Sequence, residues 1–164
     1  MEFIVEEMKD EDWPKVADIY REGLATGDAT FETDVSEWER WDNNHLSGCR
    51  LVARAGKQIT GWVALSSVSG RCVYSGVAEV SIYVKSSARG QGIGKALLEA
   101  ATKESERIGI WTLQSGTFPE NVASIAIQKA CGFREVGTRE KIGCMYGRWR
   151  DVVLMERRSR IVGI

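Results

Sequence analysis

A glycine-rich segment at residues 89–95 has the composition of an anion-binding loop. It reads Arg89-Gly90-Gln91-Gly92-Ile93-Gly94-Lys95 and lies between an apolar, β-branched stretch and a stretch with helical periodicity. Backbone N–H groups and the positive end of the helix dipole converge where such a loop opens a helix, and glycine lets an anion approach the backbone closely. We therefore predict that this segment binds a diphosphate, with Arg89 adding a guanidinium group.

Two common phosphate-binding motifs are excluded by the spacing of these glycines. A nucleotide P-loop has four residues between its glycines and continues Gly-Lys-Ser/Thr, whereas three residues separate Gly90 from Gly94 and Ala96 follows Lys95. A dinucleotide fingerprint reads G-x-G-x-x-G in a first βαβ unit, whereas this loop reads G-x-G-x-G in the middle of the chain. A purely structural turn is the remaining alternative to diphosphate binding.

Metal and thiol chemistry are also disfavoured. Cys49, Cys72, Cys131 and Cys144 form no C-x-x-C pair, and no histidine lies close enough to complete a zinc signature, so no metal site is predicted. We expect reduced, mostly buried thiols, as in cytoplasmic proteins. His45 is the single histidine and no nucleophile-elbow sequence accompanies it, so we expect a packed or partly exposed side chain in preference to a catalytic one.

Length and charge narrow the class of protein further. The chain has 164 residues, 43% of them hydrophobic and 27% charged, which is typical of one globular domain, residues 1–164. Its 22 Lys and Arg against 23 Asp and Glu give a net charge of −1, so no summed positive field is available to bind nucleic acid. No apolar stretch approaches the roughly 20 residues that span a bilayer, and the N-terminus lacks a basic region, so we expect a cytoplasmic protein without a membrane partner.

The elements that must position the glycine loop follow from periodicity and turn signals. Strands are predicted at residues 3–8, 50–55, 58–66, 77–84, 110–114, 133–139 and 149–157. Helices are predicted from Asp12 and Pro14 to near Gly23, from a capping box at Ser36-x-x-Glu39, over 94–108, and from Asn121 to Ala130. This order predicts an α/β layered fold with a mixed sheet.

Several segments together resemble the GNAT acetyltransferase family. Arg89-Gly90-x-Gly92-x-Gly94 after the strand residues 80–84 is similar to that family's pyrophosphate arm, and Gly132-Phe133 follows Asn121 at the family's spacing. Residues 26–33, 77–84, 118–124 and 143–152 resemble the branch of phosphinothricin N-acetyltransferases. The resemblance implies the GNAT acyl-CoA N-acyltransferase fold, with a central mixed sheet flanked by helices and splayed central strands.

The resemblance also implies acetyl-CoA as co-substrate, bound between the splayed strands without a metal. Splaying leaves N–H groups near the end of the 77–84 strand free to bind pantetheine and to polarise the thioester carbonyl. Asn121 would contact the other side of the cofactor, although it is equally suited to cap a helix, and the two roles can coexist. The implied cofactor contacts are Ile82, Tyr83, Val84, Arg89, Gly90, Gln91, Gly92, Ile93, Gly94, Lys95, Asn121 and Gln128.

Glu79 is the candidate catalytic residue. An ammonium group must lose a proton before its nitrogen can attack a thioester, so amine acylation needs a proton acceptor. A carboxylate in an apolar strand is costly unless it is paired, and desolvation raises its pKa toward a useful range. The resembled branch uses a glutamate at this place as general base, directly or through a water. The alternative is a structural ion pair at the end of the strand.

No general acid can be assigned from the sequence. Family members often carry a tyrosine seven residues after the asparagine, and the resembled branch often carries histidine, but this chain has Gln128. Glutamine cannot donate a titratable proton. Since a thiol has a pKa of about 8.5, the thiolate could leave with hydrogen-bond help from Gln128 or from Tyr83, whose alternative role is core packing.

The implied substrate contacts are Phe31, Arg71, Tyr74, Glu79 and Ser81. They come from the loop at residues 29–32, the segment 66–76 and the strand that carries Glu79. Arg71 could instead be a solvated loop residue. Relatives pair as homodimers with the region of Tyr146 and Trp149 near the active site, although Trp149 could simply be a core aromatic residue.

Three hypotheses of function follow. The first is N-acetylation of a small amine of the phosphinothricin or methionine sulfoximine type, as in antibiotic resistance, or of a metabolic amino acid. The second is acetylation of protein N-termini or lysines, which would need an open acidic groove. The third is a CoA-binding regulatory module with little turnover. It stays open because Gln128 stands where the family often has a tyrosine or histidine that can donate a proton.

Overall fold

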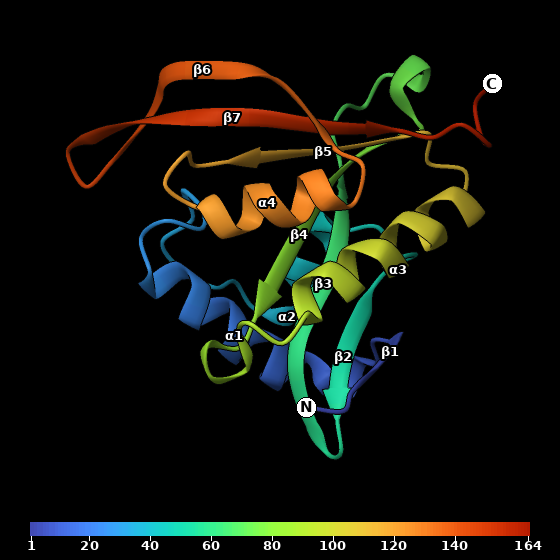
Figure 1. Cartoon of the computed structure of the whole chain (residues 1–164), viewed down its shortest axis with the longest axis vertical. Helices are drawn as coiled ribbons and strands as arrows, with labels where there is room; N and C mark the ends of the chain where they lie inside the picture. The colour runs from blue at the N-terminus through green and yellow to red at the C-terminus, as the bar shows by residue number, and fades with distance from the viewer.

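The computed structural model describes residues 1–164, and its order of helices and strands confirms the predicted one (Figure 1). The strands are β1 (Ile4–Glu7), β2 (Leu51–Ala55), β3 (Gln58–Ser67), β4 (Val77–Val84), β5 (Thr112–Thr117), β6 (Arg134–Met145) and β7 (Arg148–Arg158). The α-helices are α1 (Trp13–Ala25), α2 (Trp38–Asn44), α3 (Ile93–Arg107) and α4 (Val122–Ala130).

All seven strands form one sheet in the order β1-β2-β3-β4-β5-β7-β6. Only the pair β4 and β5 is parallel, because α3 crosses between them, and the other neighbours are antiparallel. In Figure 1, β5, β7 and β6 cross the upper part of the molecule at a large angle to β2 and β3. The predicted mixed sheet flanked by helices is thereby confirmed.

The sheet opens between its two central strands. β4 and β5 pair at Val77–Thr112, Ala78–Leu113 and Glu79–Gln114, and then no further, although β4 continues to Val84 and β5 to Thr117. This confirms the splayed central strands. We call the opening between residues 80–84 and residues 115–117 the strand gap. Backbone groups of β4 that face the gap have no strand partner, so they are available to a ligand.

Helices cover both faces of the sheet, and successive side chains of β4 point alternately toward one face and the other. Ala78 and Val80 are buried in the core cluster formed with Leu97 and Leu98 of α3. A second cluster, which includes Trp41 and Trp62, lies under α1 and α2 on the opposite face. Because neighbouring residues of a strand point to opposite faces, Glu79 and Ser81 lie on the α1 face of the sheet.

Three boundaries differ from the predictions. The capping box at Ser36 is wrong, because Glu37 is the N-cap residue of α2 and Ser36 lies outside the helix. α1 continues past Gly23 to Ala25, since that glycine serves packing: a Cβ there would lie 2.4 Å from Cδ1 of Tyr83. β6 runs six residues beyond its predicted end, to Met145, and turns into β7 through Tyr146 and Gly147, whose φ angles of 52° and 73° suit a tight hairpin.

The predicted burial of the cysteines and of Trp149 also differs from the structure. All four cysteines are free, but only Cys49 is buried, while Cys72 and Cys144 are exposed. The prediction of mostly buried thiols is therefore wrong. Trp149 is 61% exposed and is no core residue, because the β6–β7 hairpin extends beyond the helices that cover the sheet. His45 does pack as predicted, with its ring stacked on Trp41 and Nδ1 2.7 Å from the Trp41 carbonyl oxygen.

Candidate functional site

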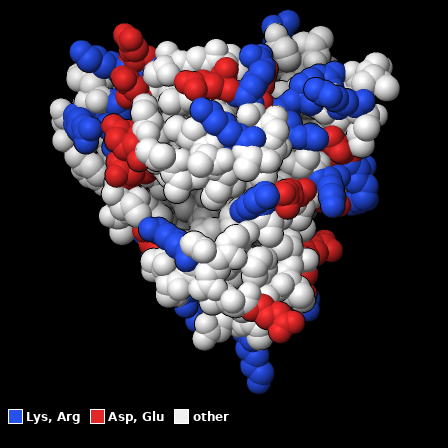
Figure 2. Space-filling model, in the orientation of Figure 1, with Lys and Arg blue, Asp and Glu red and all other residues white.

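The strand gap opens into a cavity of about 1220 Å³. Its walls come from the loop after α1, from β4, the glycine loop, α3, β5, α4 and β6. Pockets for small ligands usually measure roughly 300–1,000 Å³, so this cavity can hold a ligand of greater length or two ligands together. The face shown in Figure 2 carries both acidic and basic side chains, and several of the basic ones gather at its upper right.

The glycine loop forms one end of the cavity. Gly90 and Gly92 have φ angles of 75° and 81°, and a Cβ on either would meet nothing within 4 Å, so the space above them is open. The first hydrogen bond of α3 runs from the Ala96 amide to the Gly92 carbonyl, which leaves the amides of residues 93–95 without a helical acceptor. With Arg89 and Lys95 in the same wall, this end can bind an anion. The exposed Gln91 side chain does not line the cavity.

Asn121 caps α4 and also lines the cavity. Its Oδ1 accepts a hydrogen bond from the Ser124 amide at 3.3 Å, which confirms that it caps α4. It also lines the cavity, and its side-chain nitrogen donates to no protein group. The N-cap role therefore leaves an amide donor free for a ligand.

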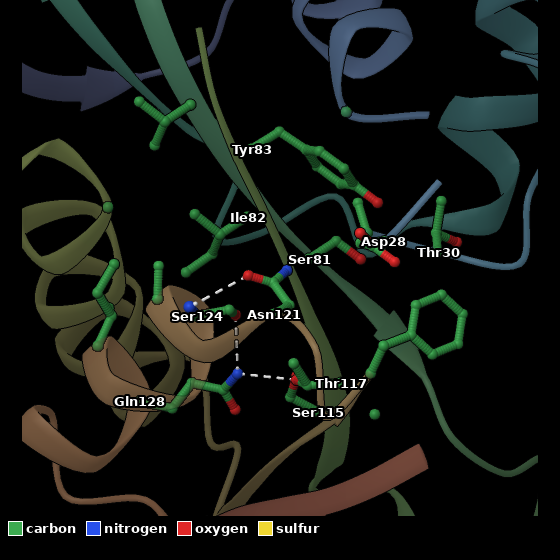
Figure 3. Close-up of a pocket in the computed structure, with 18 of the residues that line it drawn as sticks. Asp28, Thr30, Ser81, Ile82, Tyr83, Ser115, Thr117, Asn121, Ser124 and Gln128 are labelled. Carbon is green, nitrogen blue, oxygen red and sulfur yellow. Dashed lines mark hydrogen bonds between the residues drawn. The ribbon is translucent and has the colours of Figure 1, made fainter. Parts of the chain in front are cut away.

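Gln128 is the centre of a buried polar group beside Asn121. Its Nε2 donates to Thr117 Oγ1 at 2.9 Å and to Ser124 Oγ at 3.1 Å, and Ser115 Oγ lies 3.1 Å from Thr117 Oγ1 (Figure 3). The Gln128 side chain is 4% exposed, yet its Oε1 has no partner in the protein. It is the only such orphaned side-chain atom among the residues of the cavity wall, so it is suited to accept from a bound ligand.

Glu79 reaches the cavity from β4 on the other face of the sheet. It is half-buried and takes part in none of the ion pairs or side-chain hydrogen bonds of the chain, so the alternative of a structural ion pair is wrong. The register places it beside Gln114, whereas Ser115 and Thr117 point to the α4 face. A free carboxylate and the Gln128 group therefore lie on opposite faces of the strand gap.

Tyr83 packs on the same face as Glu79. Its ring is stacked on Trp62, with centroids 5.1 Å apart, and lies 4.8 Å from Tyr20. Burial raises the pKa of Tyr83, so its hydroxyl stays protonated. In Figure 3 this hydroxyl is directed toward Asp28 and Thr30 and away from Gln128. The packing alternative for Tyr83 is confirmed, although the residue also lines the cavity.

The loop after α1 closes the Glu79 side of the cavity. The rings of Phe31 and Phe118 meet edge to face at 4.8 Å, and a Cβ on Gly143 of β6 would lie 2.5 Å from the Phe31 ring. Below them, Arg150 binds Asp28 at 2.8 Å and Glu120 at 3.4 Å. Of the predicted substrate contacts, Phe31, Glu79 and Ser81 line the cavity.

Two predicted substrate contacts lie elsewhere. Arg71 and Tyr74 are exposed, do not line the cavity, and face each other with the guanidinium 5.5 Å from the ring centroid. The sequence analysis missed Arg139 and Gly143, which line the cavity from β6, and Arg150, which binds Asp28 and Glu120 beside it. Of these, Gly143 lies beyond the predicted end of β6. Position 150 gave no local signal, because the neighbouring residues Arg148 and Asp151 are charged as well.

These residues fit a long ligand with an anionic end and an amide-bearing arm, such as acetyl-CoA. The glycine loop leaves open space above free amides, and Gln128 offers an unsatisfied acceptor further along the cavity. No three His, Cys, Asp or Glu side chains come together in a way that could hold a metal ion. None of the helices combines the length and apolar composition that a membrane span needs.

Comparisons with known proteins agree with this geometry. A sequence model described as "Acetyltransferase (GNAT) family" matches residues 10–133. The chain is 30% identical over 161 residues to a phosphinothricin N-acetyltransferase of Alcaligenes faecalis, which covers 92% of this chain and 79% of that protein. It is 24% identical over 151 residues to an L-methionine sulfoximine/L-methionine sulfone acetyltransferase of Pseudomonas aeruginosa, covering 88% of each chain.

Solved structures show the same fold. A phosphinothricin acetyltransferase from Sinorhizobium meliloti in complex with acetyl-CoA superposes with a TM-score of 0.86 at 28% identity, covering 96% of this chain and 89% of that one. A structure titled ribosomal-protein-alanine N-acetyltransferase, from Brucella melitensis, superposes with a TM-score of 0.89 at 28% identity, covering 95% and 99%.

Proposed function

Since the chain belongs to the GNAT acetyltransferase family, an acetyl-CoA-dependent class of enzymes, we propose that it acetylates the amino group of a small amino-acid-like substrate. The substrate type we propose is that of phosphinothricin and methionine sulfoximine, which the names of the relatives indicate for those proteins. The proposal is supported above all by the free Glu79 carboxylate, which shares one cavity with the free amides of the glycine loop.

In the proposed complex the glycine loop binds the diphosphate of acetyl-CoA. The amides of residues 93–95, together with Arg89 and Lys95, supply hydrogen bonds and positive charge for this group. The free backbone of Ile82, Tyr83 and Val84 and the amide of Asn121 would hold the pantetheine arm along the strand gap. The bound thioester supplies the acetyl group and a leaving thiolate.

Glu79 acts as the base in this proposal. It accepts a proton from the substrate ammonium, directly or through one water, so that the neutral nitrogen can attack the thioester carbonyl in a ternary complex. A backbone N–H of β4 at the strand gap stabilises the negative charge that develops on the carbonyl oxygen. Phe31 and Phe118 shield the amine from solvent on the same side.

A panel of amines tests this function. Release of free CoA thiol is measured with phosphinothricin, methionine sulfoximine and a lysine peptide. Glu79→Gln should lower turnover about 10²- to 10⁴-fold with little change in acetyl-CoA affinity by calorimetry. Glu39→Gln, which changes an exposed carboxylate outside the cavity, is the matched control. An unchanged rate in Glu79→Gln would remove Glu79 from the reaction, and binding without transfer to any amine would favour a regulatory CoA-binding module.

Acetylation of a protein N-terminus is the second candidate. It is supported by the likeness to the Brucella melitensis structure and by the unpaired carboxylates of Glu32 and Glu79 in the cavity wall, which would attract a cationic peptide. A peptide with a free N-terminal alanine belongs in the same panel. A higher kcat/KM for that peptide than for every free amino acid would select this candidate.

We also propose that two copies pair through the β6–β7 hairpin. Tyr146 and Trp149 are 82% and 61% exposed, which is unusual for aromatic residues of a monomer. Light scattering on the purified chain should give twice the monomer mass, and Trp149→Ser should lower it. A monomeric wild-type chain would contradict the pairing without touching the proposed reaction.

A further inference from the structure

The amide of Gln128 determines which way two hydroxyl protons point. Both of its donated hydrogen bonds end on hydroxyl oxygens, those of Thr117 and Ser124. A hydroxyl that accepts from an amide has its own proton left to donate in another direction. Gln128 therefore turns the O–H bonds of Thr117 and Ser124 away from itself.

The two hydroxyls differ in where that proton can go. Thr117 is buried and its Oγ1 lies 3.1 Å from Ser115 Oγ, so its proton can be donated to Ser115 within the protein. The only side-chain hydrogen bond of Ser124 is the one that it accepts from Gln128. Because Ser124 lines the cavity and makes no other side-chain hydrogen bond, its proton is free to be donated to a ligand.

This donor lies on the face of the strand gap opposite Glu79. The register of β4 and β5 directs Ser115 and Thr117 to the α4 side and Glu79 to the α1 side. An amine that approaches a thioester in the gap from Glu79 therefore has the Ser124 hydroxyl across the gap, where α4 begins (Figure 3).

We propose that Ser124 is a catalytic residue that donates a hydrogen bond to the leaving thiolate, and that Gln128 is the residue that positions it. This inference rests on the proposed function. As the carbon–nitrogen bond forms, the carbon–sulfur bond breaks and its electron pair goes to sulfur, while the nitrogen's proton goes to Glu79. Ser124 keeps its proton and stabilises the sulfur anion, which takes a proton from water after release.

The unsatisfied Oε1 of Gln128 supports the same assignment. The side chain is more than nine-tenths buried and lines the cavity, so this oxygen lacks a partner until a ligand supplies an N–H group. The pantetheine arm of CoA carries amide N–H groups. Such a bond would hold the Gln128 amide in the orientation that directs its nitrogen at Ser124.

The thiol pKa of bound CoA provides a readout besides activity. It is measured from the ultraviolet absorbance of the thiolate during a pH titration of the CoA complex. A hydrogen bond from Ser124 favours the thiolate, so the wild-type complex should titrate below the ordinary thiol value of about 8.5. Ser124→Ala should raise the bound thiol's pKa to the free value or above and lower kcat roughly tenfold, a loss typical of one hydrogen bond to a developing charge.

Two further variants make the test specific. Gln128→Glu keeps the shape but accepts hydrogen bonds, so it should draw the Ser124 proton to itself and reproduce the Ser124→Ala titration. Thr117→Val removes the other hydroxyl to which Gln128 donates, which also lines the cavity but can donate its proton to Ser115, and should leave the bound thiol's pKa unchanged. All three are checked for fold by circular dichroism and for CoA affinity by calorimetry.

The outcomes separate this inference from the proposed function. If the wild-type chain acetylates an amine but Ser124→Ala keeps both the wild-type rate and the wild-type thiol titration, only the role of Ser124 is overturned. An equal shift in Thr117→Val and Ser124→Ala would also overturn it, because the effect would then be structural. If the wild-type chain binds no CoA, the proposed function fails and this inference fails with it.

Discussion

The guanidinium carbon of Arg150 lies 4.0 Å from the centroid of the Phe118 ring. The same side chain, 4% exposed, binds the Gly27 carbonyl and the Asp28 carboxylate at 2.8 Å and reaches Glu120 at 3.4 Å. One buried cation thus connects the loop after α1, which carries Phe31, to the segment before α4, which carries Asn121. Arg150 does not line the cavity, so it can hold these two segments of the proposed active site together without contacting either substrate.

Replacing Arg150 should therefore loosen the cavity as well as the fold. Arg150→Met leaves Asp28 without its cationic partner and Glu120 with Arg148 alone; because both carboxylates are partly exposed, we expect a loss of about 1–3 kcal/mol in the free energy of unfolding. The KM for the amine should rise more than that for acetyl-CoA. Urea denaturation and steady-state kinetics measure these effects. Arg148→Met, on the same strand but exposed, should cost less than about 0.5 kcal/mol, and equal losses in both variants would contradict the role of Arg150.

Gly92 should be required for acetyl-CoA binding and not only for the turn. Gly92→Val places a side chain in the open space above the loop and should weaken acetyl-CoA binding at least tenfold by calorimetry. Gly56→Val is the matched control, since Gly56 also has a positive φ and open space but lies in the β2–β3 turn. Both variants bear a similar backbone strain of about 1–2 kcal/mol, so equal affinities would make the glycine loop merely structural.

From the residues alone, the sequence predicts those parts of the site where a residue breaks a local rule, whereas the strand gap was implied only by the resemblance to the GNAT family. Glu79 stands out because a carboxylate is costly in an apolar strand. Gly92 stands out because spaced glycines before a helix let an anion approach the backbone amides closely. Arg139, Gly143 and Arg150 could not be found in this way. Their place in the site depends on the register and length of the β6–β7 hairpin, which is decided by a tight turn at Tyr146 and a bulge after Arg139. Such non-local pairing leaves no periodic signal in one strand alone.

The single histidine should make the stability of the fold depend on pH. Burial against Trp41, together with the nearby Arg50 charge, lowers the pKa of His45 below its ordinary value of 6.5. The unfolded chain then binds a proton more readily than the folded one, so stability is complete above about pH 6.5 and declines as the pH falls through that value. The difference in unfolding free energy between wild type and His45→Gln, followed from pH 7.5 to 5, isolates this effect, and NMR of the one imidazole gives its pKa directly. A pKa above 6.5 would reverse the sign and contradict the prediction.

Tyr83 should contribute to the reaction through its ring and not through its hydroxyl. The hydroxyl lies on the Glu79 face of the sheet, away from Gln128 and Ser124, and burial keeps it protonated by raising its pKa. Tyr83→Phe should therefore keep kcat within about threefold of wild type, because a group that transfers no proton is not needed for general acid catalysis. Tyr83→Ala, by contrast, removes the ring stacked between Trp62 and Tyr20 and should cost about 3–5 kcal/mol of stability, as large-to-small changes of packed aromatic residues do. Kinetics and thermal unfolding of the two variants check this division, and a kcat loss of a hundredfold or more in Tyr83→Phe would instead make its hydroxyl the acid that Gln128 does not supply.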